Sequence, residues 1–132
     1  MKKVLAIIYK IEKKQKRFLI LHRKLRWTGW ECIKETMEEN ESEEETLRRG
    51  INEEIGVVKG DIEKHVPINI KLTDGSIIKK AFLVRIDVEE KIDITKNKSR
   101  EHDAYQWVSQ EEARKLLTYK NIVEVMNKLI KD

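Results

Sequence analysis

The stretch of sequence that decides the fold runs from Glu41 to Val57 and reads ESEEETLRRGINEEIGV. It predicts a helix that begins after Ser42, because a serine ahead of an acidic first turn accepts hydrogen bonds from free backbone N–H groups. Glu45 stands three residues beyond Ser42 and completes a capping box. Gly56 follows the helix as a C-terminal stop. One apolar stripe at the helical repeat lies between these signals and consists of Leu47, Ile51 and Ile55.

Short apolar runs on both sides of this helix predict strands. They lie at residues 4–9, 18–22, 30–33, 57–58, 66–72, 77–87 and 104–108. Residues 35–41 and 89–100 predict loops, and an Asp-Gly turn at 73–76 predicts a hairpin. Ser109 and Glu112 form a second capping box, which predicts a helix through Leu117, and a last helix is expected at 120–130.

This order of elements predicts an α+β fold, in which a mixed β-sheet is flanked by helices in an α/β/α sandwich. The 132 residues suit a single domain over 1–132. The single cysteine, Cys32, excludes an intrachain disulfide. No apolar run approaches the ~20 residues that a membrane helix needs, so we expect no membrane association and a cytoplasmic protein. Trp107 is expected in the core.

The net charge of +4 is unevenly distributed along the chain. Residues 31–55 hold ten glutamates against one lysine and two arginines, a balance of −7, and the remainder carries +11. A local acidic cluster in a basic protein is what a cation site facing a polyanionic substrate needs. The alternative is a solvated acidic helix.

Two adjacent carboxylates on the predicted helix are the candidate metal ligands. At ~100° per residue, Glu54 falls at the edge of the apolar stripe and Glu53 lies farther round the same flank, with position 50 between them. Hard cations such as Mg²⁺ take oxygen ligands and leave room for phosphate oxygens and water. The arrangement favours metal-assisted attack on a diphosphate.

The spacing resembles the Nudix box, a marker of the Nudix hydrolase superfamily. That box runs Gly, five residues, Glu, seven residues, Arg-Glu, an aliphatic residue, any residue, Glu-Glu, any residue, Gly, an aliphatic residue. Two positions depart from it, because Glu35 stands at the opening glycine and Gly50 at the glutamate after the arginine. Seven positions match: Glu41, Arg49, Ile51, Glu53, Glu54, Gly56 and Val57.

Segments outside the box resemble the diadenosine tetraphosphate (dinucleoside polyphosphate) hydrolase branch of this superfamily. Trp30 to Lys34 is similar to the approach to the loop in those enzymes. Glu101 to Trp107 is similar to their Glu-His-x-x-Tyr-x-Trp segment, and Leu116 to Lys120 resembles the start of their last helix. The resemblance therefore covers most of the chain.

The resemblance implies roles for particular residues. Glu53 and Glu54 would bind Mg²⁺ or Mn²⁺ near an attacking water, and Arg49 would orient a box glutamate, with Glu41 as its partner. Glu101 would add a carboxylate. Independently of the resemblance, Glu38 or Glu39 is an alternative further ligand if the chain is a hydrolase. The substrate-binding candidates are Lys34 facing the phosphates, His102 contacting a phosphate and Tyr119 stacking on a base. Alternatively His102 is a surface loop histidine, and Tyr119 packs against the sheet.

Three functions follow from these patterns. The first is Mg²⁺-dependent hydrolysis of a nucleoside polyphosphate, with a dinucleoside polyphosphate favoured. The second is a nucleotide-binding or regulatory module with little catalysis, because Gly50 removes a box carboxylate and the loop has lost its glycines. The third is action on an RNA 5′ end, which the basic remainder of the chain fits, although no RNA-binding motif is present. No DNA partner is expected.

Overall fold

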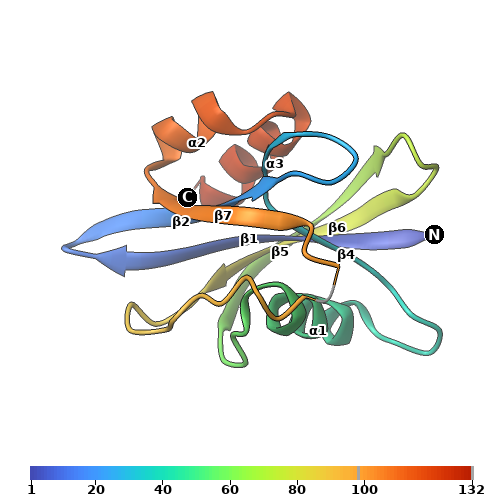
Figure 1. Cartoon of the computed structure of the whole chain (residues 1–132), viewed down its shortest axis with the longest axis horizontal. Helices are drawn as coiled ribbons and strands as arrows, with labels where there is room; N and C mark the ends of the chain where they lie inside the picture. The colour runs from blue at the N-terminus through green and yellow to red at the C-terminus, as the bar shows by residue number, and fades with distance from the viewer. Residues whose placement is uncertain (98, 132) are drawn as a thin grey trace.

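The computed structural model describes residues 1–97 and 99–131, and these form one mixed sheet with helices on both faces (Figure 1). This confirms the predicted α+β sandwich. The helices are α1 (Glu43–Ile55), α2 (Gln110–Leu116) and α3 (Lys120–Ile130). The strands are β1 (Lys2–Glu12), β2 (Gln15–Arg23), β3 (Gly29–Glu31), β4 (Ile33–Thr36), β5 (Asp61–Lys71), β6 (Ile77–Arg85) and β7 (His102–Val108).

The strand β1 is the centre of the sheet. It runs parallel to β6 and antiparallel to β2 and β4, and β5 continues the sheet beyond β6. The ladder between β1 and β2 extends only from Tyr9 to Glu12 on β1. Nearer its beginning β1 pairs with β4, while the later part of β2 pairs with β3 and β7. The two strands therefore separate toward the end where β1 begins and β2 ends.

Both faces of β1 are buried, which explains its unbroken apolar sequence. Alternate side chains of a strand point to opposite faces. Val4, Ala6 and Ile8 join the core under α1, and Leu5, Ile7 and Tyr9 join the core under α2 and α3. Figure 1 shows α1 on one side of the sheet and α2 and α3 on the other.

Helix α1 has the ends that the sequence predicts. The Glu45 amide donates to Ser42 Oγ over 3.1 Å, and the Ser42 amide donates to Glu45 Oε1 over 2.8 Å. Gly56 adopts φ +74°, a conformation that costs glycine little, and ends the helix. The stripe of Leu47, Ile51 and Ile55 is buried against the sheet. The second capping box, at Ser109 and Glu112, is also present.

One predicted strand is absent, and three other predictions differ from the structure in their bounds or in the degree of burial. Residues 57–58 form no strand, because Val57 packs into the core as the chain leaves α1 and Val58 is exposed. The strand predicted at 30–33 is broken at Cys32 into β3 and β4. The expected loop at 35–41 begins only at Met37, since β4 continues to Thr36. Trp107 is half-buried, not fully within the core, and the ammonium of Lys10 lies 4.3 Å from its ring centroid.

Within the part of the chain that the structure describes, no helix is long and apolar enough to cross a membrane.

We expect Ser42→Ala to destabilise the fold by about 1 kcal/mol, because it removes the side-chain acceptor at the start of α1. The midpoint of thermal unfolding should fall by about 3–5 °C for a chain of this size. Ser42→Asp retains an acceptor and is the matched control. Equal stability of wild type and Ser42→Ala in urea titrations would contradict this role of the cap.

Candidate functional site

A cavity of about 640 Å³ opens at the end of the sheet where β1 begins and β2 ends. Its wall combines acidic, basic and aromatic side chains. The carboxylates are Glu31, Glu35, Glu53, Glu54, Asp74 and Glu101; the basic groups are Lys3, Arg23, Arg26, Lys34, Lys71 and His102; and the large aromatic rings are Trp27 and Tyr119. A wall of both signs with an aromatic edge suits a ligand that has charged and flat parts.

Helix α1 presents two different carboxylates to this cavity. Glu54 lies next to the buried stripe and is only 7% exposed. Glu53, one residue earlier, is turned about 100° away and its side chain is 51% exposed. The same short segment therefore supplies one anchored carboxylate and one that is accessible from the cavity.

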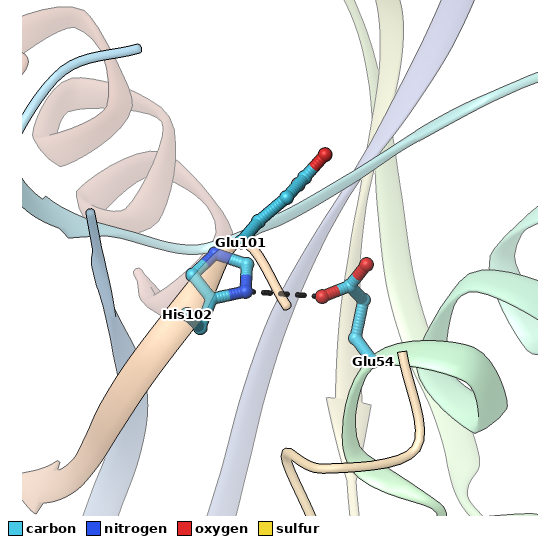
Figure 2. Close-up of side chains that lie close together, drawn as sticks. All are labelled: Glu54, Glu101 and His102. Atoms are coloured by element: carbon cyan, nitrogen blue, oxygen red, sulfur yellow. Dashed lines mark hydrogen bonds and ion pairs between the residues drawn. The ribbon is translucent and has the colours of Figure 1, made fainter. Parts of the chain in front are cut away.

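A line of alternating charges holds Glu54 in place, and Figure 2 shows its first contact, between Glu54 and His102. His102, at the beginning of β7, lies 3.0 Å from Glu54 Oε2 through Nδ1 and 2.7 Å from Glu31 Oε2 through Nε2. Glu31 is paired in turn with Lys34 Nζ at 3.1 Å and Arg23 Nη1 at 3.1 Å. Asn97 donates a hydrogen bond to the other oxygen of Glu54. Residues from β2, β3, β4, α1 and β7 are thus joined.

These contacts shift the ionisation of the buried groups. Burial alone would lower the pKa of His102, but its hydrogen bonds to Glu31 and Glu54 outweigh burial and raise the pKa to about 9. Burial alone would raise the pKa of Glu31, yet the bond from His102 and the charges of Lys34 and Arg23 hold it at about 2. His102 is therefore an imidazolium cation between two carboxylates near neutral pH.

Arg49 fastens the loop before α1 to the helix. Its Nε and Nη2 donate to the two oxygens of Glu41 over 2.8 and 2.9 Å, and Nη2 also donates to the carbonyl of Thr36 over 2.7 Å. Hydrogen bonds from Arg49 lead the interactions that lower the pKa of Glu41 to about 2. Arg49 is not part of the cavity wall, and Glu41 is occupied by this pairing. Arg49 and Glu41 therefore stabilise the position of the loop and of β4 relative to α1 without lining the cavity themselves.

The donor set fits a divalent cation. Single ligand atoms of Glu54, Glu101 and His102 lie within 4.8 Å of one another. Both ring nitrogens of His102 already contact carboxylates, so the imidazole holds Glu54 and Glu31 in position and has no free nitrogen for a cation. The remaining donors are carboxylate oxygens, which hard cations such as Mg²⁺ and Mn²⁺ prefer. Glu53 adds an exposed carboxylate to the wall of the same cavity.

An aromatic pair forms another part of the wall. Trp27 and Tyr119 meet edge to face, with ring centroids 5.2 Å apart. The guanidinium of Arg23 lies 5.5 Å from the centroid of the Trp27 ring, and the ammonium of Lys34 lies 5.8 Å from it. Tyr119 is 46% exposed, so its ring is open to a ligand.

The structure brings most of the predicted site residues together. Six of them line the cavity, namely Glu53, Glu54, Glu101, Lys34, His102 and Tyr119, and Arg49 supports it from behind. Glu38 and Glu39, the alternative ligands, are not among the lining residues. Interpreting His102 as a surface loop residue is wrong, since it is 8% exposed and begins a strand. Tyr119 lies at the cavity and does not pack under the sheet.

Sequence reasoning missed three lining residues that matter, Arg23, Glu31 and Glu35. Glu31 belongs to the segment from Trp30 to Lys34, but the pattern of that segment indicates no role for it. Glu35 was visible only as a departure from the box. No motif in the sequence around Arg23 indicates that it belongs to the site.

We expect the imidazole of His102 to stay protonated up to about pH 9 in protein freed of divalent metal by a chelator. Because this folded-state pKa lies above the ordinary value of 6.5, protonation stabilises the fold fully below pH 6.5, and that contribution is lost as pH rises toward 9. Titration of the ring nitrogens by NMR measures it. Glu31→Gln removes one carboxylate partner and should lower the pKa. A wild-type midpoint near 6.5 would show that the imidazole is not held between the carboxylates.

Comparisons with known proteins place this architecture in a family. The family model described as NUDIX domain matches residues 1–130. Comparison with curated proteins finds no match. The fold is similar to that of the binary complex of an Ap4A hydrolase from C. elegans, with a TM-score of 0.84 and 20% identity, covering 96% of this chain and 93% of that chain.

Two further solved structures share the fold. The dihydroneopterin triphosphate pyrophosphohydrolase of E. coli is 20% identical over 96% of this chain and 92% of its own, with a TM-score of 0.73. The Nudix domain of Shewanella oneidensis NrtR, complexed with ADP ribose, is 15% identical over 97% of this chain and 86% of its own, with a TM-score of 0.67. At these identities the likeness concerns the fold, and the family model covers nearly the whole chain. The chain belongs to the Nudix family.

Proposed function

We propose that this Nudix protein hydrolyses a phosphoanhydride bond of a nucleoside polyphosphate with the help of Mg²⁺ or Mn²⁺, and that dinucleoside polyphosphates are its favoured substrates. The observation that carries this proposal is the composition of one cavity wall. Carboxylates of α1 and of the segment before β7 share it with basic groups and with an aromatic pair. These three kinds of group suit, respectively, a cation, a polyphosphate and a base.

Glu53, Glu54 and Glu101 are the residues that would hold the cation. A divalent cation bound there would neutralise phosphate charge and make a nearby water more acidic. Glu54 is pre-oriented for this role, because both of its oxygens already accept hydrogen bonds, from Asn97 and from His102. Glu53 has no such constraint from the core and remains exposed.

The basic part of the wall would hold the polyphosphate. Lys34 and Arg23 lie on the cavity with Glu31 as a shared partner, so each is fixed in position before a ligand arrives. Arg23 also lies 3.5 Å from Glu101. Lys3, Arg26 and Lys71 add positive charge to the same wall. Fixed cations favour the phosphate chain without further reorganisation on binding.

The reaction would form one P–O bond and break another. The oxygen of water attacks one phosphorus, the bridging P–O bond breaks, and the released nucleotide leaves as the phosphate anion. The proton of the attacking water passes to a carboxylate on the wall. Glu53 suits this step better than Glu54, because both oxygens of Glu54 are already hydrogen-bonded within the protein.

The preference for dinucleoside polyphosphates is supported by two features. The segments around Trp30, His102 and Tyr119 resemble that branch, and the overall fold is similar to that of the C. elegans Ap4A hydrolase. Tyr119 and Trp27 offer an open aromatic edge for one base.

We expect the wild-type chain to release nucleotide from diadenosine tetraphosphate only when Mg²⁺ or Mn²⁺ is present. Glu54→Gln should lower kcat by about a hundredfold or more, because loss of even a supporting contact at a metal site costs about 10–100-fold. Glu53→Gln should also lower kcat strongly. Glu44→Gln is the matched control, since it makes the same change on the exposed face of α1, outside the cavity.

Metal-independent turnover, or full activity in Glu54→Gln, would contradict the assigned site. Nucleotide binding by the wild type without hydrolysis of any nucleoside polyphosphate would favour the nucleotide-binding module in its place. Unfolding midpoints of all variants show whether a loss reflects the site or the fold.

We expect Tyr119→Ala to raise KM for diadenosine tetraphosphate about tenfold with little change in kcat, since stacking of one base on an aromatic ring contributes about 1–3 kcal/mol. Tyr119→Phe retains the ring and should behave as the wild type. Stability should change little because Tyr119 is 46% exposed. An unchanged KM in Tyr119→Ala would remove this residue from the binding site.

A further inference from the structure

The two departures from the Nudix box touch each other in space. A glutamate, Glu35, stands where the pattern has its opening glycine, and a glycine, Gly50, stands where the pattern has a glutamate. A Cβ atom placed on Gly50 would lie 2.7 Å from Cβ of Glu35 and 2.9 Å from its Cγ. Both distances are too short for ordinary packing, so Glu35 in its observed position requires glycine at position 50.

This contact gives a physical reason for a glycine inside α1. Glycine in a helix interior costs about 1 kcal/mol relative to alanine, and Gly50 is buried in the middle of the helix. Glycine is required here because the side chain of Glu35, on β4, passes so close to the helix that no Cβ fits at position 50.

The Glu35 carboxylate occupies the side of the helix where a side chain of residue 50 would lie. Its Oε1 is 3.3 Å from the Cβ position on Gly50. Its Oε2 accepts a hydrogen bond from the Thr36 amide over 3.1 Å and lies 3.4 Å from Arg49 Nη1. Glu35 also lines the cavity, together with Glu53 and Glu54.

The electrostatics agree with this placement. Burial raises the pKa of Glu35, and the carboxylates of Glu53 and Glu54 raise it further, while Arg49 and the Thr36 amide act in the opposite direction. The geometric support is that Glu35, Glu53 and Glu54 all line the same cavity. Arg49 faces Glu35 and Glu53, and His102 faces Glu54, so two protein cations already balance part of this negative charge. A divalent cation would balance the remainder.

We propose that Glu35 replaces the missing box glutamate, and that its carboxylate, entering from β4 over Gly50, completes with Glu53 and Glu54 the oxygen donors for the divalent cation. This inference rests on the proposed function for the identity of the cation. The pair of positions 35 and 50 retains one carboxylate and one glycine, in exchanged places. In this arrangement the metal site keeps its third carboxylate, which comes from position 35 and not from position 50.

The test is binding of Mn²⁺ to the full chain, measured by calorimetry and by the electron paramagnetic resonance signal of free Mn²⁺. The variants are Glu35→Gln, Gly50→Glu and the double exchange of Glu35→Gly with Gly50→Glu. Glu38→Gln is the matched control, because Glu38 also contacts Arg49, at 3.0 Å, but does not line the cavity. Glu54→Gln reports whether Mn²⁺ occupies the proposed site at all.

We expect Glu35→Gln to weaken Mn²⁺ binding about tenfold or more, as loss of a direct ligand should cost at least as much as loss of a supporting contact. Glu38→Gln should bind as the wild type. Gly50→Glu alone should bind no better than the wild type and should unfold at a lower temperature, because its Cβ collides with Glu35. The double exchange should recover most of the affinity, which would show that the two positions are coupled.

Mn²⁺ binding that is unchanged in Glu35→Gln, or weakened equally in Glu35→Gln and Glu38→Gln, would overturn the inference and leave Glu35 as a partner of Arg49 only. If Glu54→Gln abolishes both Mn²⁺ binding and hydrolysis while Glu35→Gln changes neither, the proposed function stands and this inference fails. If Mn²⁺ binding depends on Glu35 but no nucleotide is hydrolysed, the inference stands and the proposed function fails. A wild type that binds no Mn²⁺ would overturn both.

Discussion

The buried carboxylate of Glu54 is the constraint around which the site is organised. A carboxylate that is 7% exposed must be compensated by partners, because removing a charge from water without them costs several kcal/mol. His102 supplies the positive charge, and Glu31 on the far side keeps His102 protonated. This requirement draws α1, β3 and β7 to one place. The space left at that place, where β1 and β2 separate, is the cavity.

The same constraint divides the work between two adjacent glutamates. Glu54 is held rigidly and can define the position of a ligand, while Glu53 lies one helical step away and is accessible to it. Arg49 contributes from behind by clamping Glu41 and the carbonyl of Thr36, so that the loop and β4 keep a fixed distance from the helix. Precise placement of charged groups before a ligand binds is what makes electrostatic stabilisation effective.

The two departures of this chain from the family box, Glu35 and Gly50, are explained by the contact between β4 and α1. Glycines in such a loop are usually explained by positive φ, but between Lys34 and Glu41 only Asn40 adopts it, with φ 66°. Asparagine takes up that conformation at modest cost. Glu35 lies within β4, where no glycine is required, and its side chain fills the space above Gly50. A sequence pattern specifies positions along the chain, but binding of a cation depends on where the carboxylate oxygens lie in space.

The sequence alone determined the features that depend on neighbours within one or two helical turns. The caps of α1 at Ser42 and Gly56, the buried stripe between them and the α+β order of elements were all predictable, because capping and periodicity are local. The box spacing also located Glu53 and Glu54. Only the tertiary structure decided the environment of His102, whose partners lie 48 and 71 residues away, and the contact of Glu35 with Gly50. Burial and ion pairing arise from segments that approach in space, and no local pattern records that approach.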